Sequence, residues 1–349
     1  MMRALVLSGW QQSPEVRDVP VPEPRAGEAL IRVAGAGACH SDLHLMEFPP
    51  GVLPFDPPFV LGHENTGWVE TVGDGVAGVH PGEAVAVFGP WGCGFCRTCR
   101  QGEENYCERA GELNEMAPGI GHDGGMAEFL RVPARLLVPL GDLDPVEAAP
   151  LTDAGLTPYH AIKRSLDVLV PGSTAVVIGA GGLGHMAIQI LAALTPARIV
   201  VVDVSDAKLA QARELGADDA WAPADDAVTR IRSATKDLGA QLVLDFVGSD
   251  ESLSLALAAS RVRGHLTIVG LGGGTLPLSF FGIPYECSVA TTYWGNITEL
   301  REVLALAEAG RIRSRVETFS LERATEAYER MAAGQIEGRA VITPNASAA

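Results

Sequence analysis

Basic residues are scarce in this sequence. Its 349 residues include 26 lysines and arginines against 43 aspartates and glutamates, so the formal net charge at pH 7 is −17. A surface this acidic repels phosphate backbones and anionic lipids, which argues against nucleic acids and membrane surfaces as partners. Charged residues make up only 20% of the chain and hydrophobic residues 47%, a composition typical of globular proteins. At about 150 residues per domain, the length predicts two domains.

Cysteine is also rare. Six cysteines are too few to cross-link a secreted scaffold of this length with disulfides. Four of them fall within the fifteen residues from Cys93 to Cys107, and such clustering indicates a metal site in a reducing compartment.

Long uninterrupted hydrophobic runs are missing. The apolar run in the N-terminal segment MMRALVLSGW is too short for a signal peptide. Residues 168–197 carry no charge and are long enough to span a bilayer, but two prolines and five glycines interrupt them. Strand, glycine loop and helix explain this stretch better, and we expect a soluble cytoplasmic protein.

Short β-type runs dominate the first 152 residues and predict a β-rich domain. These runs are Arg3–Leu7, Ala29–Ala34, Gly67–Val72, Glu83–Phe88 and Ala127–Val132. After Thr152, nearly continuous β-branched runs alternate with segments of helical period, which favours a doubly wound parallel sheet. The runs cover residues 174–179, 198–203, 240–246 and 265–270, and the helical segments are Leu183–Leu194, Asp206–Leu215, Asp225–Leu238 and Ser252–Ala259. The tail from Thr292 is mixed, with helices near Thr298–Ala309 and Leu321–Ala333 and a strand at Arg339–Thr343, and we expect it to fold back onto the first domain.

A glycine pattern follows the strand at 174–179 and opens a helix. Gly179 permits a tight turn, Gly181 lets the backbone approach a pyrophosphate, and Gly184 allows close packing of strand and helix. Asp203 ends the next strand, where a carboxylate can accept hydrogen bonds from an adenosine ribose diol and repels a 2′-phosphate. The pattern therefore predicts an NAD site. Gly182, Leu183 and Lys208 are the other residues of this region that we expect to bind the cofactor. In the alternative interpretation the glycines only form a turn and Asp203 caps the following helix.

Cys93, Cys96, Cys99 and Cys107 can supply four thiolates to one tetrahedral Zn²⁺. A zinc ion with four protein ligands has no open position for substrate, so its role would be structural. An iron–sulfur cluster is the alternative for this spacing.

A catalytic zinc ion needs three protein ligands and one open position. Cys39 in GACHSDLH and His63 in LGHENTG are candidates. Taken singly, each could equally be an ordinary buried residue.

The settings of these two residues resemble a known family. The run Gly62-His63-Glu64-x2-Gly67-x5-Gly73-x2-Val76 matches the zinc signature of the medium-chain dehydrogenase/reductase family, and residues 39–44 resemble its first zinc-ligand segment. Residues 87–96, 150–162 and 292–295 look like NAD-dependent secondary alcohol dehydrogenases of actinobacteria. The resemblance implies a GroES-like catalytic domain of residues 1–152 and 292–349, with a structural zinc lobe at about 91–108. It also implies a Rossmann-type NAD-binding domain of residues 153–291.

The resemblance implies Cys39, His63 and a third residue as catalytic zinc ligands. Many relatives use a cysteine near the domain junction, but no cysteine occurs between Cys107 and Cys287. Asp153 occupies the matching place and is the predicted third ligand; the alternative is that it caps the next helix. Glu64 is an alternative ligand or a group behind the ligands. The implied content is two Zn²⁺ and one NAD per chain.

The resemblance also implies a proton path through Ser41, the nicotinamide ribose and His44, although His44 could be a surface residue without a role. Further cofactor contacts are expected from His40, Thr157, Phe246, Val247, Gly270, Leu271 and Arg339, of which His40 and Arg339 face the pyrophosphate. The substrate cleft is expected to be lined by Phe55, Ile120, Phe281, Tyr293 and Trp294, any of which could instead be core.

This lining has no lysine or arginine to hold an anionic group. It predicts hydrophobic secondary alcohols and ketones, and some primary alcohols and aldehydes, as substrates. A polyol or amino-alcohol dehydrogenase of the same family is the alternative, and a non-catalytic NAD-binding protein is a more distant one. The family resemblance implies a homodimer or homotetramer.

Overall fold

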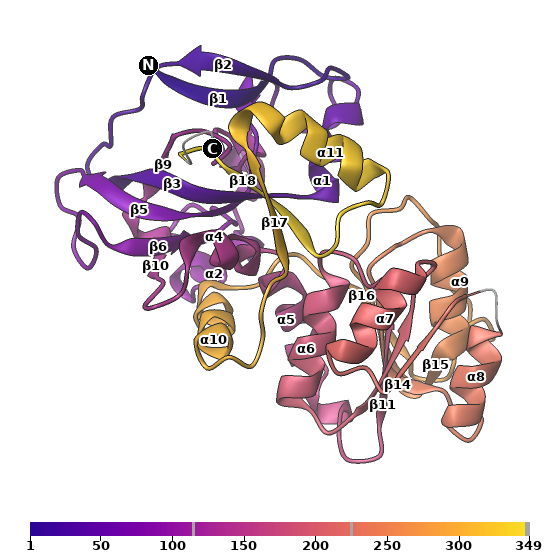
Figure 1. Ribbon diagram of the computed structural model, residues 1–349. Coiled ribbons are helices and arrows are strands. Elements are labelled where there is room, and N and C mark those ends of the chain that lie inside the picture. The colour runs from indigo at the N-terminus through magenta and orange to yellow at the C-terminus, as the bar shows by residue number, and fades with distance from the viewer. Residues whose placement is uncertain (114–115, 224–225, 346–349) are drawn as a thin grey trace. The chain divides into compact units, whose positions relative to one another are not determined.

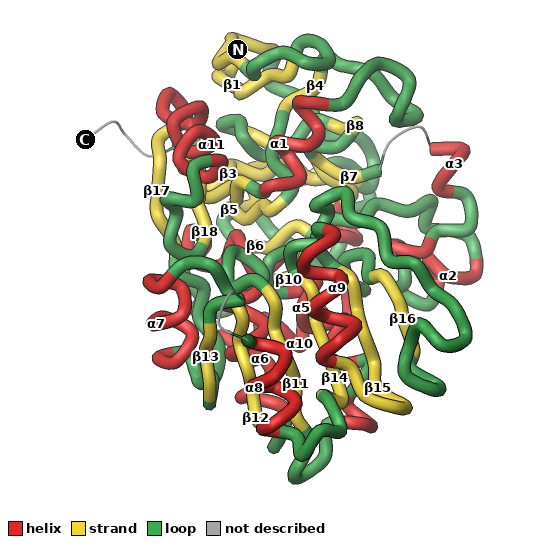
Figure 2. Tube along the Cα trace, turned by 90° about the vertical axis from the view of Figure 1, so that its right-hand side faces the viewer, coloured by secondary structure: helices red, strands yellow, loops and turns green. Residues whose placement is uncertain are grey.

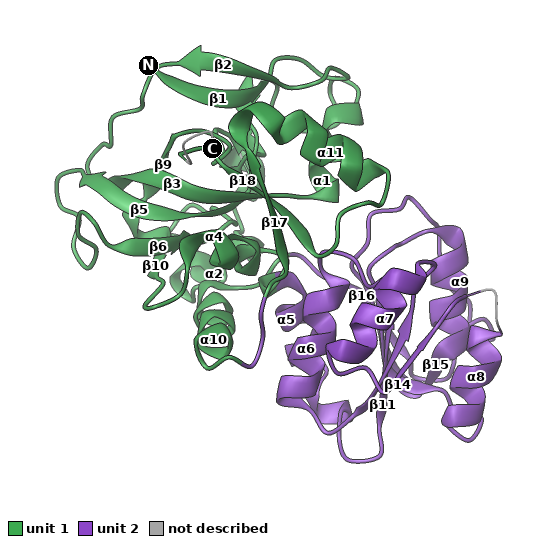
Figure 3. Ribbon diagram, in the orientation of Figure 1, with its two compact units in different colours: residues 1–156, 294–310, 314–349 green, residues 157–293, 311–313 purple. Residues whose placement is uncertain are grey.

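The computed structural model (Figure 1) describes residues 1–113, 116–223 and 226–345. Two compact units divide them (Figure 3). The first unit contains residues 1–156, 294–310 and 314 onward, and the second contains residues 157–293 and 311–313. Among the described residues, no helix is long and apolar enough to cross a membrane.

A seven-stranded sheet forms the frame of the first unit. Its order is β10-β6-β5-β3-β18-β17, with β9 also paired to β3, and only β17 and β18 run parallel. The bounds are β3 (Glu28–Ala38), β5 (Glu64–Val72), β6 (Ala84–Val87), β9 (Phe129–Pro133), β10 (Leu137–Pro139), β17 (Val316–Ser320) and β18 (Arg339–Thr343). Strands β17 and β18, from the tail of the chain, thus complete a sheet whose first strand in sequence is β3.

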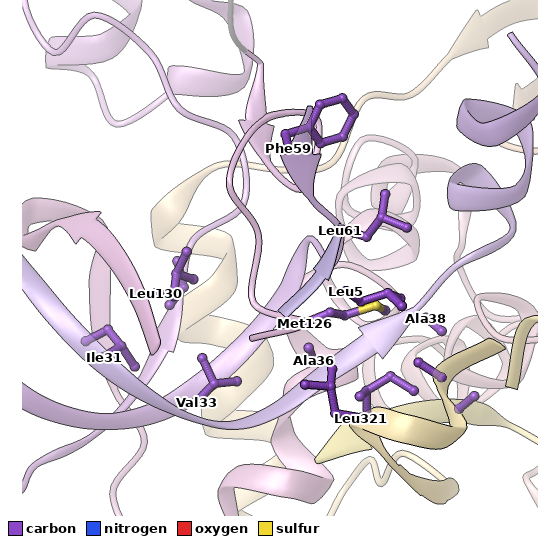
Figure 4. Close-up of a cluster of buried hydrophobic side chains, with 14 of the residues drawn as sticks. Leu5, Ile31, Val33, Ala36, Ala38, Phe59, Leu61, Met126, Leu130 and Leu321 are labelled. Carbon is purple, nitrogen blue, oxygen red and sulfur yellow. The ribbon is translucent and has the colours of Figure 1, made fainter. Parts of the chain in front are cut away.

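Two smaller sheets complete the strands of this unit. They comprise β2-β1-β4 and the pair β7-β8, with bounds β1 (Met2–Leu7), β2 (Glu15–Val19), β4 (Phe59–Val60), β7 (Ala117–Pro118) and β8 (Gly121–His122). Between the sheets lies a cluster of buried apolar side chains, drawn in part in Figure 4. Leu5 on β1, Ile31 on β3 and Leu61 just after β4 are fully buried in this cluster, because these segments direct apolar side chains to the same interior.

Short helices surround these sheets. The α-helices are α1 (His40–Glu47), α2 (Arg97–Arg100), α3 (Ala110–Leu113), α4 (Pro145–Ala148), α10 (Ile297–Glu308) and α11 (Ala324–Ala332). The 3₁₀ turns are η1 (Glu104–Tyr106), η2 (Ala134–Leu136), η3 (Ala149–Thr152) and η5 (Leu321–Arg323). Helix α11, near the C-terminus, packs beside α1, near the N-terminus (Figure 1).

The second unit is a parallel six-stranded sheet. Figure 2 shows its strands in the order β13-β12-β11-β14-β15-β16. Their bounds are β11 (Thr174–Ile178), β12 (Arg198–Val202), β13 (Asp219–Trp221), β14 (Ala240–Asp245), β15 (Ser260–Ile268) and β16 (Ser288–Thr291). The helices are α5 (Leu156–Lys163), η4 (Leu166–Val168), α6 (Gly184–Leu194), α7 (Asp206–Glu214), α8 (Ala227–Ala234) and α9 (Asp250–Ala259). The predicted class, a parallel doubly wound sheet plus a β-rich domain, is confirmed.

The helix predicted at Asp225–Leu238 is shorter than expected. Asp225 lies outside the described residues, and α8 ends at Ala234. Lys236 and Asp237 adopt positive φ angles of 54° and 62°, followed by Gly239 at 87°, and these left-handed residues end the helix.

Candidate active site and metal centres

Three side chains from separate segments of the first unit meet at one point. Cys39 is the residue before α1, His63 precedes β5, and Asp153 follows η3. One ligand atom from each lies within 4.8 Å of the other two. Cys39 and His63 are buried, and the side chain of Asp153 is 12% exposed. A thiolate, an imidazole and a carboxylate so arranged suit a Zn²⁺ ion that keeps one open position. We call these residues the ligand trio.

Asp42 lies behind the ligand trio, although no metal-ligand motif in the sequence indicates a role for it. Its Oδ1 is 3.1 Å from Nδ1 of His63, and its Oδ2 accepts a 2.9 Å hydrogen bond from the backbone N–H of Cys39. A carboxylate at Nδ1 leaves Nε2 of the imidazole for a metal. The side chain at the third position of a helix often accepts a hydrogen bond from the backbone N–H of the residue that precedes the helix. This local pattern, Asp42 three residues after Cys39, could have identified Asp42 from the sequence.

The electrostatics of the ligand trio call for a positive charge. Burial lowers the pKa of His63, but the neighbouring carboxylates of Asp42 and Asp153 raise it, and the net pKa is well above the usual value. The acidic groups around His63 therefore favour a positive charge at this point of the structure. A divalent cation would supply that charge, so the residues present fit zinc.

Glu64 does not belong to the ligand trio, because it is engaged elsewhere. Its carboxylate accepts hydrogen bonds of 2.9 Å from Nε and 2.6 Å from Nη2 of Arg339, and 3.0 Å from the backbone N–H of Ala154. Burial raises the pKa of Glu64 and Arg339 opposes the rise, leaving the pKa above its usual value. At Gly37, which faces Glu64 on β3, a Cβ atom would lie 1.8 Å from this carboxylate, so only glycine fits there.

Arg339 is the first residue of β18 and is 3% exposed. Besides Glu64, its Nη2 lies 3.8 Å from Oδ2 of Asp153. The guanidinium is thus held behind a member of the ligand trio, and the predicted contact with a cofactor pyrophosphate stays a prediction.

The other predicted site residues of the first unit lie on α1, against His63 or at the large apolar cluster. Ser41 and His44 lie one turn apart on α1 and are partly exposed, and His40 at its start is exposed. The indole of Trp294 packs edge-on against His63, with ring centroids 5.8 Å apart, and its backbone φ of 49° is unusual for such a residue. Phe55 and Ile120 lie in or against the large apolar cluster.

The four clustered cysteines form a second group. The ligand sulfurs of Cys93, Cys96, Cys99 and Cys107 all lie within 4.8 Å of one another. The hydroxyl of Thr98 and nearby backbone N–H groups lower the pKa of Cys96 to about 6, and backbone N–H groups from Phe95 and Cys96 lower the pKa of Cys93. Such donors stabilise thiolates, so the group suits a closed tetrahedral Zn²⁺ site.

In the second unit, the glycine loop has the geometry that dinucleotide binding requires. Gly179 adopts a φ of 86°, and a Cβ on Gly184 would lie 1.9 Å from the carbonyl oxygen of Gly179. Nothing lies within 4 Å of a Cβ built on Gly181, which leaves the backbone open to a ligand. The loop continues through Gly182 and Leu183 into the start of α6, and the N-terminus of a helix attracts anions.

Asp203 follows β12 and is fixed beside this loop. Its Oδ2 accepts from the backbone N–H of Ala180 at 2.7 Å and its Oδ1 from that of Ser205 at 2.9 Å. Lys208 lies on α7, just beyond. The segments containing Phe246–Val247 and Gly270–Leu271 follow β14 and β15 and contact each other, since a Cβ on Gly270 would lie 2.2 Å from the backbone of Val247.

Three more predicted residues belong to the second unit. Thr157 is buried on α5, Tyr293 is 37% exposed, and Phe281 is 86% exposed beside Phe280. Their assignments to cofactor and substrate remain predictions.

Comparison with known proteins decides the family. The family model described as "Alcohol dehydrogenase GroES-like domain" matches residues 25–142, and the family model described as "Zinc-binding dehydrogenase" matches residues 182–309. An NAD-dependent alcohol dehydrogenase of Sulfurisphaera tokodaii is 39% identical over 98% of this chain and 100% of its own length. The chain belongs to the zinc-containing medium-chain dehydrogenase/reductase family.

Other members of this zinc-containing family are similar over nearly the whole chain. A D-arabinose 1-dehydrogenase (NADP(+)) of Saccharolobus solfataricus is 35% identical over 98% of this chain and 97% of its own length. The crystal structure of the alcohol dehydrogenase from Aeropyrum pernix superposes with a TM-score of 0.90 at 35% identity, covering 98% of this chain and all of that one. Of the predicted metal ligands, Cys39, His63 and the four cysteines lie in the segment 25–142 that the GroES-like family model matches, and Asp153 lies outside both family-model matches, as does Arg339.

Proposed function

We propose that this member of the family is an NAD-dependent zinc alcohol dehydrogenase that oxidises hydrophobic secondary alcohols, and some primary alcohols, and reduces the corresponding ketones and aldehydes. The observation that carries the proposal is the buried ligand trio of Cys39, His63 and Asp153 in one compact unit. A chain that only bound NAD would have no need of this trio, and relatives named alcohol dehydrogenases support the reaction class.

Cys39, His63 and Asp153 would hold the catalytic zinc ion, and the four cysteines a structural one. Bound at the ligand trio, zinc supplies a Lewis acid that lowers the pKa of an alcohol hydroxyl. With only two anionic ligands and a neutral imidazole, the centre would carry no net negative charge and would remain electrophilic. Asp42 fixes the ring of His63 through Nδ1, and Arg339 holds Glu64 away from the ligand trio.

The glycine loop and Asp203 would bind NAD, which accepts the hydride. The open backbone at Gly181 and the start of α6 receive the pyrophosphate, and Asp203 accepts from the adenosine ribose. Ser41 and His44, one helical turn apart and both partly exposed, offer a path for the alcohol proton to solvent. His40 and Arg339 are the proposed pyrophosphate contacts from the first unit.

Trp294 supports a hydrophobic substrate, because its indole packs against a zinc ligand and leaves an apolar surface at the metal. Phe55, Ile120, Phe281 and Tyr293 are the other proposed lining residues. A sugar or polyol substrate is the second candidate, and the 35% identity to a D-arabinose dehydrogenase favours it. An apolar lining disfavours it, since buried substrate hydroxyls would lack hydrogen-bond partners.

A substrate panel run beside metal analysis tests the proposal. Protein purified with zinc should contain two zinc ions per chain, and kcat/KM with NAD should be highest for hydrophobic secondary alcohols. Higher kcat/KM for D-arabinose or polyols would favour the second candidate. Iron and sulfide, or full activity with one metal per chain, would contradict the proposed centres.

Replacing Asp203 with serine should shift cofactor preference from NAD toward NADP. The carboxylate favours the ribose diol of NAD and repels the 2′-phosphate of NADP. A charge-assisted hydrogen bond contributes about 1.5–3 kcal/mol, so the ratio of kcat/KM for NAD over NADP should fall about 10- to 100-fold or more. Lys208 partly offsets the negative charge, so wild type should prefer NAD strongly without excluding NADP.

Asp206→Asn is the matched control for this change. It removes the same charge three residues further on, from an exposed side chain in the first turn of α7. The control should leave the NAD/NADP ratio within about twofold of wild type. An Asp203→Ser ratio equal to that of the control would refute the ribose-binding role.

A further inference from the structure

Tyr328 connects the C-terminal helix α11 to the group behind the ligand trio. It is 4% exposed, and its Oη donates a 2.9 Å hydrogen bond to Oδ2 of Asp42, a residue 286 positions earlier in the chain. The same Oη lies 3.2 Å from Sδ of Met126. Asp42 itself is 1% exposed, so its carboxylate depends on protein groups rather than on water for hydrogen bonds.

The two oxygens of Asp42 have different partners. Oδ2 accepts from the backbone N–H of Cys39 and from the hydroxyl of Tyr328, both at 2.9 Å, while Oδ1 lies 3.1 Å from Nδ1 of His63. The Cys39 bond is local to the first turn of α1 and would tolerate rotation of the carboxylate about its Cβ–Cγ bond. The Tyr328 bond comes from another helix and fixes the plane of the carboxylate, which directs Oδ1 to His63.

We propose that Tyr328 is a positioning residue of the zinc centre: through its hydroxyl it orients Asp42, and through Asp42 it orients His63. This inference rests on the proposed zinc function. It assigns to the C-terminal helix a part in the metal site, although α11 contributes no ligand. Burial and the nearby Asp42 raise the pKa of Tyr328 well above its usual value, so the phenol keeps the proton that it donates.

Removing only the hydroxyl tests this role. In Tyr328→Phe the ring still fills its place, but the carboxylate of Asp42 loses one donor and one constraint. Changes to groups that orient zinc-bound histidines typically cost 10- to 100-fold in metal affinity or activity. We expect zinc at the ligand trio to be released to a chelator about 10- to 100-fold faster than in wild type. Release from the four cysteines and the Kd for NAD should be unchanged.

Co²⁺ substitution at the ligand trio provides a second measurement. The visible absorption of protein-bound Co²⁺ reports ligand geometry, so the bands of Tyr328→Phe should shift relative to wild type, a result that loss of stability alone would not give. Met126→Leu is the matched control, because it replaces the other contact of the hydroxyl at nearly constant volume and spares Asp42. Its zinc release and Co²⁺ bands should equal those of wild type.

A double-mutant cycle with Asp42→Asn identifies the route of the effect. If Tyr328 acts through Asp42, adding Tyr328→Phe in the Asp42→Asn background should change zinc release less than twofold. Full additivity, or wild-type release and Co²⁺ bands in Tyr328→Phe, would overturn the inference. If instead the proposed zinc function is wrong, the wild-type protein would contain no zinc at the ligand trio, and metal analysis would distinguish this outcome from failure of the inference about Tyr328.

Discussion

Asp153→Asn should lower kcat/KM for alcohol oxidation by about 100-fold or more and should remove most of the zinc from the ligand trio. The neutral amide is a poor ligand for Zn²⁺ compared with a carboxylate. The substitution also removes one of the negative charges that raise the pKa of His63 and that would attract the cation. Steady-state kinetics with a secondary alcohol and metal analysis of the same preparation measure both effects.

Glu64→Gln is the matched control for this prediction. It makes the same chemical change at an adjacent carboxylate that is held by Arg339 and Ala154 instead of facing the ligand trio. Activity should fall by about tenfold at most, with zinc retained. A reversed order, in which Glu64→Gln loses zinc and Asp153→Asn keeps it, would identify Glu64 as the third ligand.

Arg339→Met should destabilise the protein strongly. The substitution leaves the fully buried carboxylate of Glu64 without its cation, beside the carboxylate of Asp153. Removing one partner of a buried ion pair costs about 3–5 kcal/mol, which corresponds to a fall in Tm on the order of 10 °C. Thermal unfolding followed by circular dichroism measures the change.

The pH dependence of this loss follows from Glu64. Its pKa is already raised by burial in the folded protein, and losing Arg339 should raise it further. The folded state of the variant then binds a proton more readily than the unfolded state. The deficit in stability should therefore be smallest below about pH 4, the pKa of an unfolded glutamate, and should grow as the pH rises through the raised pKa.

Two further variants control the prediction for Arg339. Glu64→Gln combined with Arg339→Met removes both charges and should recover most of the lost Tm. Arg315→Met breaks an exposed ion pair with Glu337 and should change the Tm little. Equal effects of Arg315→Met and Arg339→Met would show that burial of the pair does not matter.

A local structure can be predicted from the sequence when all the residues that it requires lie within one short segment. The glycine loop is such a case, because the positive φ of Gly179 and the contact of Gly184 with Gly179 lie within six residues. The four cysteines are another, since one short segment brings their sulfurs together. The proposed zinc ligands Cys39, His63 and Asp153 are distant in sequence, and only the resemblance of their surroundings to a known family related them to one another.

The sequence does not predict which polar groups are paired in the interior. Tyr328 and Asp42 are 286 residues apart, and no periodicity or motif relates them. The ion pair of Arg339 with Glu64 depends on the register of β18 and β5 on either side of β3. A shift of one residue in either strand would turn these side chains to the opposite face, so only the assembled sheet defines the pair.

The place of β18 in the sheet also bears on the order in which the protein is made. Residues 1–156 leave the ribosome with β3 lacking one neighbour, which is supplied only by residues 339–343 after the entire second unit has been synthesised. The second unit is almost continuous in sequence, so it can fold while the chain is still growing. The sheet of the first unit stays incomplete until β18 has been synthesised, and Arg339 and Tyr328 are the last residues to join the surroundings of Cys39, His63 and Asp153. The unit whose synthesis starts first is therefore the unit whose sheet is completed last.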